Sequence, residues 1–373
     1  MKKIVYIVFG INKALEFEWL ISEIDTSRFE LSFISIHPNE ETHLKKHCEN
    51  HQVPFYHIPY NSKKDILKST LKIRKMLKKI DPDIVHSHIF EGGLIGITAA
   101  WLAGIKHRIY TRHYSDFHHV YHPNGLKYDQ WINARSTHIV AVSEVVKDIL
   151  IKKENVPKQK VSVIHHGIPQ EEDNCFNYAR ISVIKEKYNI PDGKQLIGVV
   201  SRYTKLKGIQ FIIPALKELF EENENLHLVL ANAKGNDEVT IKKLLQKLPK
   251  DAYTEILFEN DNEALFRSFD VFIHVPISRE AEAFGLTYLE ALNFDVPSVF
   301  TLSGIAHEMV KDEENALVVN YQNSDEIVEA VRKLLANEEL RIKLSNNGKK
   351  SVETYTTRKK MRKLEELYEN VRL

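Results

Sequence analysis

The stretch KKIVYIVFG, residues 2–10, is a run of apolar residues that begins with two lysines and ends in a glycine. The stretch KQLIGVVSR, residues 194–202, repeats this design in the middle of the chain. An unbroken apolar run of this length predicts a strand that is buried on both faces, as in a parallel sheet. Two such strand-like runs in a chain of 373 residues predict two α/β domains of the same kind.

Short apolar runs alternate with amphipathic segments along the rest of the chain, which predicts doubly wound, Rossmann-like sheets. We expect strands at 4–9, 31–36, 84–86, 138–142, 161–164, 196–200, 226–230, 271–275, 298–301 and 317–319. The charged, periodic segments 62–80 and 325–336 fit helices. The polar stretch 169–177 is the expected linker, which places one domain at 1–170 and the other at 178–351.

Composition limits the class of protein. With 43% hydrophobic and 28% charged residues, the chain has the make-up of a globular protein. No window approaches the roughly 20 apolar residues of a membrane span, and the apolar run after the amino terminus is too short for a signal peptide. Cys48 and Cys175 are the only cysteines and lack the spacing of a metal site. We therefore expect a cytoplasmic protein.

Charge is distributed unevenly, because residues 1–168 hold 24 Lys+Arg against 17 Asp+Glu, and the remainder holds 28 against 34. A basic half indicates an anionic partner, which could be lipid, nucleic acid or a phosphorylated substrate. Much of the excess lies in 62–80, where Asp65 is the only acid. We expect its inward residues to be Ile66, Leu67, Thr70, Leu71, Ile73, Leu77 and Ile80. Such a helix is either a contact with the anionic inner face of a membrane or a solvated outer helix.

The loop SRYTKLKG, residues 201–208, follows an expected strand and places Arg202 and Lys207 five residues apart, with Gly208 after them. An arginine and a lysine in one loop suit a diphosphate, because charge-assisted bonds to phosphate are strong. A solvated basic turn would have the same sequence, so both interpretations stay open at this point.

The stretch REAEAFGLTYLEAL, residues 279–292, predicts a helix that is apolar on nearly all sides and yet contains Glu290. A buried carboxylate needs a partner. The expected helix start, whose free N–H groups favour an anion, is formed by Phe284, Gly285 and Leu286. A sugar nucleotide would satisfy the group, with ribose hydroxyls on Glu290 and sugar hydroxyls near Glu282, which precedes the helix. The alternative is a carboxylate that caps a neighbouring loop.

Polar residues also follow the expected strands of the first half. The acceptor-side candidates are Gly10, His88, Arg112 and Asp116. His113, which follows the strand-like segment RIYT, is the strongest candidate for a role in a cleft. We place His86 and His88 on opposite faces of their strand and therefore expect no zinc site.

Together these motifs resemble the retaining glycosyltransferases of the GT-B fold, specifically glycosyltransferase family 4. The segment from Glu282 to Glu290 looks like that family's E-x7-E motif, and Arg202 and Lys207 match its diphosphate-binding pair. PDIVHSH, residues 82–88, is similar to its acceptor-side strand end. Each motif alone is weak, but in this order along most of the chain they are specific.

The resemblance implies two Rossmann-like domains that face each other across a cleft, with a final helix, about 352–373, that returns to the first domain. Glu282 would contact the donor sugar, and His113 would line the site beside sugar and acceptor, so these two are the expected catalytic residues. The leaving diphosphate would take the acceptor proton, and neither a metal nor another cofactor would be needed. The donor-binding residues would be Arg202, Lys207, Phe284, Gly285, Leu286 and Glu290.

We therefore expect a hexosyltransferase that moves a sugar from a nucleotide-sugar, a UDP-sugar before others, to a hydroxyl of a glycan or lipid-linked acceptor. Surface polysaccharide biosynthesis is the expected pathway, and nucleic acid is not an expected partner. The chain departs from the family pattern at Gly10, where paired glycines are frequent, and at His166, which stands in place of the usual asparagine.

Three other functions fit parts of this pattern. A sugar-nucleotide epimerase would convert its donor without any acceptor, and a phosphorylase or sucrose-type synthase would use phosphate or a soluble sugar. A non-catalytic sugar-nucleotide-binding protein would not need Glu282 and Glu290 together with Arg202 and Lys207. A nicotinamide dehydrogenase is not expected, because no G-x-G-x-x-G follows a strand.

Overall fold

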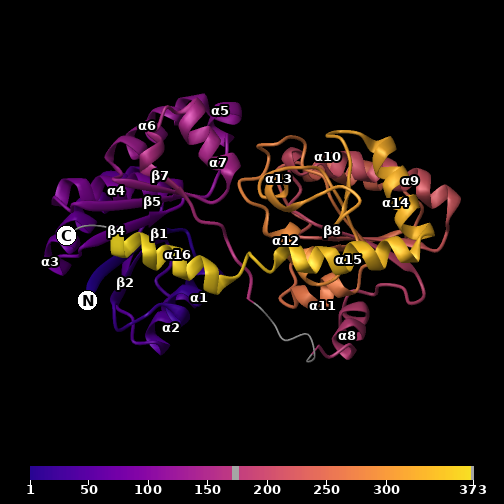
Figure 1. The fold of residues 1–373 in the computed structure, drawn as a ribbon, viewed down its shortest axis with the longest axis horizontal. Helices are drawn as coiled ribbons and strands as arrows, with labels where there is room; N and C mark the ends of the chain where they lie inside the picture. The colour runs from indigo at the N-terminus through magenta and orange to yellow at the C-terminus, as the bar shows by residue number, and fades with distance from the viewer. Residues whose placement is uncertain (170–175, 371–373) are drawn as a thin grey trace. The chain divides into compact units, whose positions relative to one another are not determined.

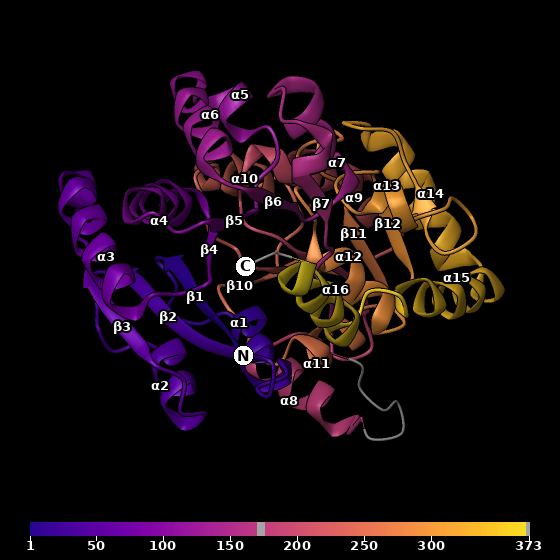
Figure 2. The ribbon, with the colours of Figure 1, turned by 60° about the vertical axis from the view of Figure 1, so that its left-hand side comes forward.

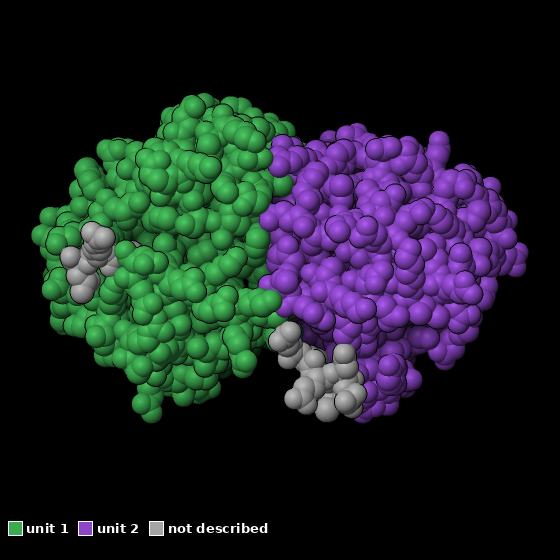
Figure 3. All heavy atoms as spheres, viewed as in Figure 1, with its two compact units in different colours: residues 1–169, 356–373 green, residues 170–355 purple. Residues whose placement is uncertain are grey.

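The computed structural model describes residues 1–169 and 176–370 and divides the chain into two compact units (Figure 3). Unit 1 consists of residues 1–169 and 356–373, and unit 2 consists of residues 170–355. Most of the expected linker, 169–177, lies outside the described residues.

Unit 1 is built on a parallel seven-stranded sheet in the order β3-β2-β1-β4-β5-β6-β7 (Figure 2). Its strands are β1 (Lys2–Phe9), β2 (Phe29–His37), β3 (Phe55–Pro59), β4 (Ile84–His88), β5 (His107–Arg112), β6 (His138–Ala141) and β7 (Val161–Val163). Its α-helices are α1 (Leu15–Glu23), α2 (His43–Asn50), α3 (Ile66–Ile80), α4 (Phe90–Ala103), α5 (Phe117–Tyr121), α6 (Leu126–Arg135), α7 (Glu144–Asp148) and α16 (Thr357–Asn370).

Both faces of the β1 strand are buried, as its unbroken apolar run predicts. Ile4, Tyr6 and Val8 pack into one core with residues of α1 and α16, whereas Val5 and Ile7 pack into a second core with residues of α3 and α4. Successive side chains of a strand point to opposite faces, so one apolar run serves two cores.

Unit 2 is built on a parallel six-stranded sheet in the order β10-β9-β8-β11-β12-β13. Its strands are β8 (Gln195–Val200), β9 (Leu226–Ala231), β10 (Tyr253–Ile256), β11 (Val271–His274), β12 (Ser298–Phe300) and β13 (Leu317–Val318). Its α-helices, drawn from magenta to yellow in Figure 1, are α8 (Ala179–Lys187), α9 (Ile209–Glu222), α10 (Glu238–Leu245), α11 (Asn262–Arg267), α12 (Leu286–Asn293), α13 (Ala306–Met309), α14 (Ser324–Ala336) and α15 (Glu338–Val352).

The predicted fold class, two Rossmann-like parallel α/β domains, is confirmed. The ten predicted strands all exist, but β3 and β10 were missed, and β5 was recognised only as strand-like. β3 and β10 are edge strands, in which partly exposed side chains interrupt the apolar run. No helix among the described residues is both long and apolar enough to span a bilayer.

The predicted final helix begins later than expected. α15 ends at Val352, a turn follows, and α16 starts only at Thr357. Thr356 forms a β-bridge with Ile168, and a Cβ atom on Gly167 would lie 2.3 Å from the Thr356 carbonyl carbon. The helix therefore breaks where the chain enters unit 1 against the backbone around residue 168.

The α16 helix is fixed to the sheet of unit 1 by buried hydroxyl and imidazole groups. The Tyr368 hydroxyl is hydrogen-bonded to the Tyr6 hydroxyl and lies 2.7 Å from His86 Nδ1. The other ring nitrogen of His86 lies 2.7 Å from the Thr111 hydroxyl. Burial lowers the pKa of His86 to about 3, so its imidazole is neutral at physiological pH. The sequence's last described helix is thus part of the first unit's core.

The α3 helix differs from its prediction in which residues face inward. Ile73 and Leu77 are buried as expected, but Leu67 is 70% exposed and Leu71 is 49% exposed. Only one side of this helix meets the unit, so the leucines lie among its lysines on the outer surface.

Candidate functional site

The order of strands reverses once in each sheet, and the candidate residues gather beside these reversals. In unit 2, β9 and β10 lie on one side of β8, whereas β11, β12 and β13 lie on the other. Ligands of open α/β sheets bind beyond the carboxyl ends of the strands at such a point. Lys207 follows β8 and Glu282 follows β11, so both predicted donor loops are at this position.

Lys207 and Glu282 are paired directly. The Lys207 ammonium donates to Glu282 Oε1, and His274 Nε2 lies 3.0 Å from the same oxygen. The Glu282 N–H donates to Ser303 Oγ at 2.9 Å. Burial alone would raise the pKa of Glu282, but Lys207 and His274 bring it down to about 2. Glu282 is therefore ionised at physiological pH, and its Oε1 atom is shared by Lys207 and His274.

The two loops approach so closely that glycine is required between them. Gly208 has a φ of +75°, and a Cβ atom there would lie 1.9 Å from the Val275 carbonyl oxygen. No other residue fits this position without moving the backbone. Gly208 thus sets the distance between the loop that carries Lys207 and the strand end that leads to Glu282.

The start of α12 lacks a side-chain cap, because the residue immediately before the helix is Gly285, which has a φ of +92°. Phe284 is buried, whereas Leu286 is 41% exposed. The first N–H groups of a helix and its dipole attract an anion, so this end can receive a phosphate.

Glu290 lies one turn along α12 and has no charged partner within the described chain. Among the described residues, its carboxylate accepts one side-chain hydrogen bond, from Asn262 Nδ2 at 3.4 Å. Burial raises the pKa of Glu290 to about 7. The carboxylate is partly exposed and lacks strong hydrogen bonds, which leaves it able to accept hydroxyl groups of a ligand.

Arg202 stands apart from this group. Its side chain is exposed and has no hydrogen-bond or ion-pair partner in residues 1–169 and 176–370. It follows β8 directly, at the same strand end as Lys207. The structure therefore places Arg202 at the correct edge of the sheet with its guanidinium unengaged.

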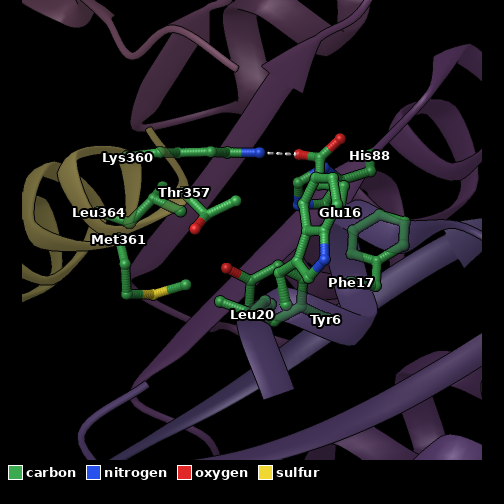
Figure 4. A pocket seen from close by; sticks show the side chains of 10 residues that line it. Tyr6, Glu16, Phe17, Leu20, His88, Thr357, Lys360, Met361 and Leu364 are labelled. Carbon is green, nitrogen blue, oxygen red and sulfur yellow. Dashed lines mark hydrogen bonds and ion pairs between the residues drawn. The ribbon is translucent and has the colours of Figure 1, made fainter. Parts of the chain in front are cut away.

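In unit 1 the reversal lies between β1 and β4, and here the structure brings together side chains that follow four different strands or belong to α16. His88 Nδ1, at the end of β4, lies 3.0 Å from His113 Nε2, just beyond β5. Glu16 on α1 is ion-paired with Lys360 on α16, and His166 Nδ1 lies 3.4 Å from Glu16 Oε2. Figure 4 shows the Lys360 and Glu16 side chains extended toward one another, with His88 beside them.

Burial decides the protonation states in this cluster. Desolvation lowers the pKa of His88 and His113, and it lowers the pKa of His166 to about 3. Burial acts in the opposite direction on Glu16, but the Lys360 ammonium holds the pKa of Glu16 well below its usual range. The histidines are therefore neutral and Glu16 is ionised at physiological pH.

The expectation for His86 and His88 was wrong in one respect. Their rings lie on the same side of β4, with centroids 4.3 Å apart, because residues two apart in a strand share a face. His86 is occupied by Tyr368 and Thr111, but His88 points into the cluster with His113 and Glu16.

Arg112 occupies a position that fits a structural role rather than the acceptor contact we expected. Its guanidinium is fully buried and donates to Glu154 Oε1 at 2.8 Å and to Asp129 Oδ2 at 3.5 Å. His118 Nδ1 lies 2.7 Å from the same Asp129 oxygen. This buried ionic network fixes the loop after β5. All three guanidinium nitrogens of Arg112 donate within it or to the loop backbone, so none is available to a ligand.

The other acceptor-side candidates lie nearer the surface. Gly10 is exposed at the end of β1 with a φ of +64°, and its N–H donates to the Ile36 carbonyl at 2.9 Å. Asp116 precedes α5 and is ion-paired with Lys153 at 3.4 Å. Within the described residues, neither is hydrogen-bonded or ion-paired with the cluster around His113.

Sequence reasoning missed four residues that the structure brings to these sites: Glu16, Lys360, His274 and Asn262. His274 had a visible signal, because it is the one polar residue in the apolar run VFIHV. Glu16 and Lys360 had none, since their proximity depends on α16 packing beside α1.

Two family models match this chain, and together they span most of it. "Glycosyltransferase Family 4" matches residues 21–172, and "Glycosyl transferases group 1" matches residues 181–351. The first match lies in unit 1 and the second in unit 2, apart from the residues around position 170.

Named relatives agree with the family models. The chain is 27% identical to the capsular polysaccharide biosynthesis glycosyltransferase CapM of Staphylococcus aureus, over 77% of this chain and 76% of CapM. It is 23% identical to an Escherichia coli UDP-Gal:alpha-D-GlcNAc-diphosphoundecaprenol alpha-1,3-galactosyltransferase, over 81% of this chain and 79% of that enzyme.

A solved structure shares the whole fold. Anabaena HepE in complex with UDP-glucose superposes with a TM-score of 0.82 over 99% of this chain and 100% of HepE, at 16% identity. The strand orders and the two family models agree. This chain belongs to the GT-B glycosyltransferases of family 4.

Proposed function

We propose that this glycosyltransferase moves a hexose from a UDP-sugar to a hydroxyl of a glycan or lipid-linked acceptor, with retention of anomeric configuration. The observation that carries the proposal is the arrangement of Lys207, Glu282 and the α12 helix start around the strand reversal of unit 2. Positive groups for a diphosphate and carboxylates for sugar hydroxyls lie together there.

The donor diphosphate would replace Glu282 as the partner of Lys207. Its oxygens would accept from Lys207, from Arg202 and from the backbone N–H groups at the start of α12. Glu290 would accept the ribose hydroxyls, which supplies the partner that its carboxylate lacks. With these donors present, we propose that no metal ion is needed to hold the diphosphate.

We propose retention because it is the outcome that the resemblance to family 4 implies. Without a donor, Lys207 and His274 hold the pKa of Glu282 at about 2 and keep its carboxylate ionised. We propose that Glu282 and His113 contact the sugar and stabilise positive charge at the reacting carbon, while the leaving diphosphate takes the acceptor proton. Positioning and electrostatic stabilisation then supply most of the rate.

The proposed donor and acceptor classes are supported by relatives. One relative is named for UDP-Gal and a diphosphoundecaprenol-linked acceptor, another for capsular polysaccharide biosynthesis, and the HepE structure contains UDP-glucose. We therefore propose surface polysaccharide or glycolipid synthesis at the inner face of the membrane as the setting.

The α3 helix is the part of unit 1 that we propose to meet an anionic membrane. Leu67 and Leu71 are exposed on it, and the basic residues around them are Lys63, Lys64, Lys68, Lys72, Arg74, Lys75, Lys78 and Lys79. Exposed apolar side chains among cations are what a helix needs to rest on an anionic bilayer surface.

The donor is tested first by thermal unfolding in the presence of UDP, GDP, ADP and CMP with their sugars, with and without EDTA. A ligand at a hundred times its dissociation constant adds about 2.7 kcal/mol to stability, which raises the melting temperature by several degrees. We expect a shift with uridine nucleotides that survives EDTA. Absence of a shift with every nucleotide would contradict the donor site.

Two neighbouring lysines provide a matched comparison. Lys207→Met should abolish the shift, whereas Lys205→Met should keep it, because Lys205 is exposed in the same turn and its side chain has no partner among the described residues. The anomeric configuration of the isolated product, read by proton NMR, then tests retention. Conversion of a UDP-sugar without acceptor would instead indicate an epimerase.

A further inference from the structure

Glu16, His88 and His113 form a compact set of metal-ligating side chains in unit 1. One ligand atom from each lies within 4.8 Å of the others. We propose that these three residues bind a divalent transition metal ion of the zinc type. Nothing in the proposed transferase chemistry requires such an ion, so the site is a function in addition to sugar transfer.

The distance between the two imidazoles suits a tetrahedral ion. Zn²⁺ is bound by imidazole and carboxylate at about 2.0–2.1 Å, which places neighbouring ligand atoms about 3.3 Å apart. His88 Nδ1 and His113 Nε2 are 3.0 Å apart, already close to one edge of that tetrahedron. Two imidazoles with one carboxylate also match the protein ligands of open zinc sites.

The rings are held in place by their surroundings. The His88 ring is stacked on the Tyr6 ring, with centroids 5.1 Å apart. It also meets the Phe17 ring in a T-shaped arrangement, with centroids 5.0 Å apart. A ring packed on two sides loses little freedom when it takes up a metal. Ligand orientation by neighbours is what makes a metal site strong.

The second ring nitrogen of His88 fixes the protonation state of the ligand. His88 is 3% exposed, and its Nε2 atom has no hydrogen-bond partner in the part of the chain that the structure describes. With the ion on Nδ1, which faces His113, Nε2 carries the ring proton, so the imidazole stays neutral while it ligates.

A small cavity of about 20 Å³ lies beside the cluster, lined in part by Glu16, His88, Thr357 and Lys360 (Figure 4). About one water molecule fits into such a space. The cavity therefore provides room for the ion's fourth ligand, a water, without rearrangement of the apolar side chains that complete its wall.

In this structure, the Lys360 ammonium is the cation paired with Glu16. It also lies 3.2 Å from His166 Nδ1. A bound metal would take Glu16 from Lys360, whose long side chain starts on the first turns of α16. The site therefore alternates between two states, one with the lysine and one with the metal, and the two cations compete for one carboxylate.

The consequence for activity rests on the proposed function. His113 is proposed to contact the sugar and the acceptor, so a metal that ligates His113 would take it away from them. We therefore expect micromolar Zn²⁺ to inhibit sugar transfer, whereas a chelator leaves the transfer rate unchanged or raises it.

Binding is tested on the full chain without a polyhistidine tag, stripped of metal and titrated with Co²⁺. Co²⁺ in a tetrahedral site absorbs visible light strongly, and Zn²⁺ should displace it and bleach the band. We expect one equivalent of Co²⁺ per chain. The readout requires neither donor nor acceptor, so it stands even if the proposed transferase activity fails.

Variants distinguish this site from the exposed pair His47 and His51, whose rings lie 4.3 Å apart. Glu16→Gln and His113→Asn should each weaken Co²⁺ binding at least about tenfold, whereas His51→Ala should leave it unchanged. Lys360→Met should tighten binding severalfold, because it removes the competing cation and leaves Glu16 in need of a partner. A gain of affinity cannot result from misfolding.

Three outcomes would overturn the proposal. They are the absence of a tetrahedral Co²⁺ band, a band that His51→Ala removes, and a band that both Glu16→Gln and His113→Asn retain. Weaker binding in Lys360→Met would also contradict the competition between lysine and metal. Circular dichroism of each variant shows that the fold is intact before the titrations are compared.

Discussion

Replacement of Glu290 by glutamine is expected to stabilise unit 2 above neutral pH. Burial raises the pKa of Glu290 to about 7, whereas the unfolded chain has an ordinary glutamate. Below pH 4.5 both states carry the proton and Glu290 costs nothing. Between pH 4.5 and 7 the unfolded state loses its proton first, so stability falls as pH rises, and above pH 7 the full cost remains.

The size of this cost follows from the displaced pKa. A rise from about 4.5 to about 7 corresponds to an upper limit of about 3 kcal/mol, at 1.36 kcal/mol per unit. Glu290 is partly exposed, so solvent screening reduces the figure. We expect Glu290→Gln to gain about 1–3 kcal/mol at pH 8 and close to nothing at pH 4.5.

The placement of tryptophan makes the assay specific. Trp19, Trp101 and Trp131 are the three tryptophans of the chain, and all of them belong to unit 1. Urea unfolding followed by tryptophan fluorescence therefore reports unit 1, while circular dichroism reports both units. The variant should shift the dichroism transition at pH 8 and leave the fluorescence transition where it is.

Glu259, a buried carboxylate whose pKa is lowered rather than raised, serves as the control. Glu259 accepts from the N–H groups of Asn260 and Asp261 and is ion-paired with Lys187, and its pKa falls to about 2 despite its burial. Glu259→Gln should therefore lose stability at pH 8 and less at low pH. If Glu290→Gln brings no gain at pH 8, or an equal gain at pH 4.5, the carboxylate is not desolvated and the reasoning is refuted. The stabilised variant should also lose affinity for UDP, because the same carboxylate is proposed to bind ribose.

Three further changes have expected outcomes. Gly208→Ala should destabilise unit 2 by more than about 1 kcal/mol, since its φ is +75° and the added Cβ would meet the Val275 carbonyl oxygen; an unchanged dichroism midpoint in urea would contradict this. Tyr368→Ala should cost unit 1 about 3–5 kcal/mol, visible in tryptophan fluorescence, because it empties a buried site in the sheet core. Sedimentation with anionic vesicles should fall with salt and with Lys68→Glu plus Lys72→Glu; equal sedimentation with neutral vesicles would exclude the α3 contact.

The central strands and the donor loops could be predicted because their signals are local. Buried parallel strands are apolar without interruption, and Lys207 and Glu282 follow two of them. Their ion pair could not be predicted, since it depends on β8 and β11 being neighbours in the sheet. The edge strand β10 was missed because its side chains are only partly buried.

Residues whose surroundings come from distant parts of the chain were the hardest to assign. Arg112 looks like a ligand-binding arginine in sequence, yet its partner Glu154 lies 42 positions later. The partner of Glu16 is Lys360, which is 344 positions away. Leu67 and Leu71 have the spacing of core residues, but the helix turns them outward because α3 has a single buried side. Periodicity gives the spacing of a face but not which face is covered.

The position of α16 in unit 1 has a consequence for synthesis on the ribosome. Residues 1–169 emerge before α16, so their core lacks Met361, Leu364 and Tyr368 until that helix has been made. At about 5–20 residues per second, the intervening unit takes roughly 10–40 s to be made. During that time the apolar surface around Tyr6 stays uncovered, whereas unit 2 can close as soon as it emerges. Unit 1 therefore completes its core only after unit 2 has been made. We expect nascent-chain chaperones to bind its uncovered apolar surface in the meantime.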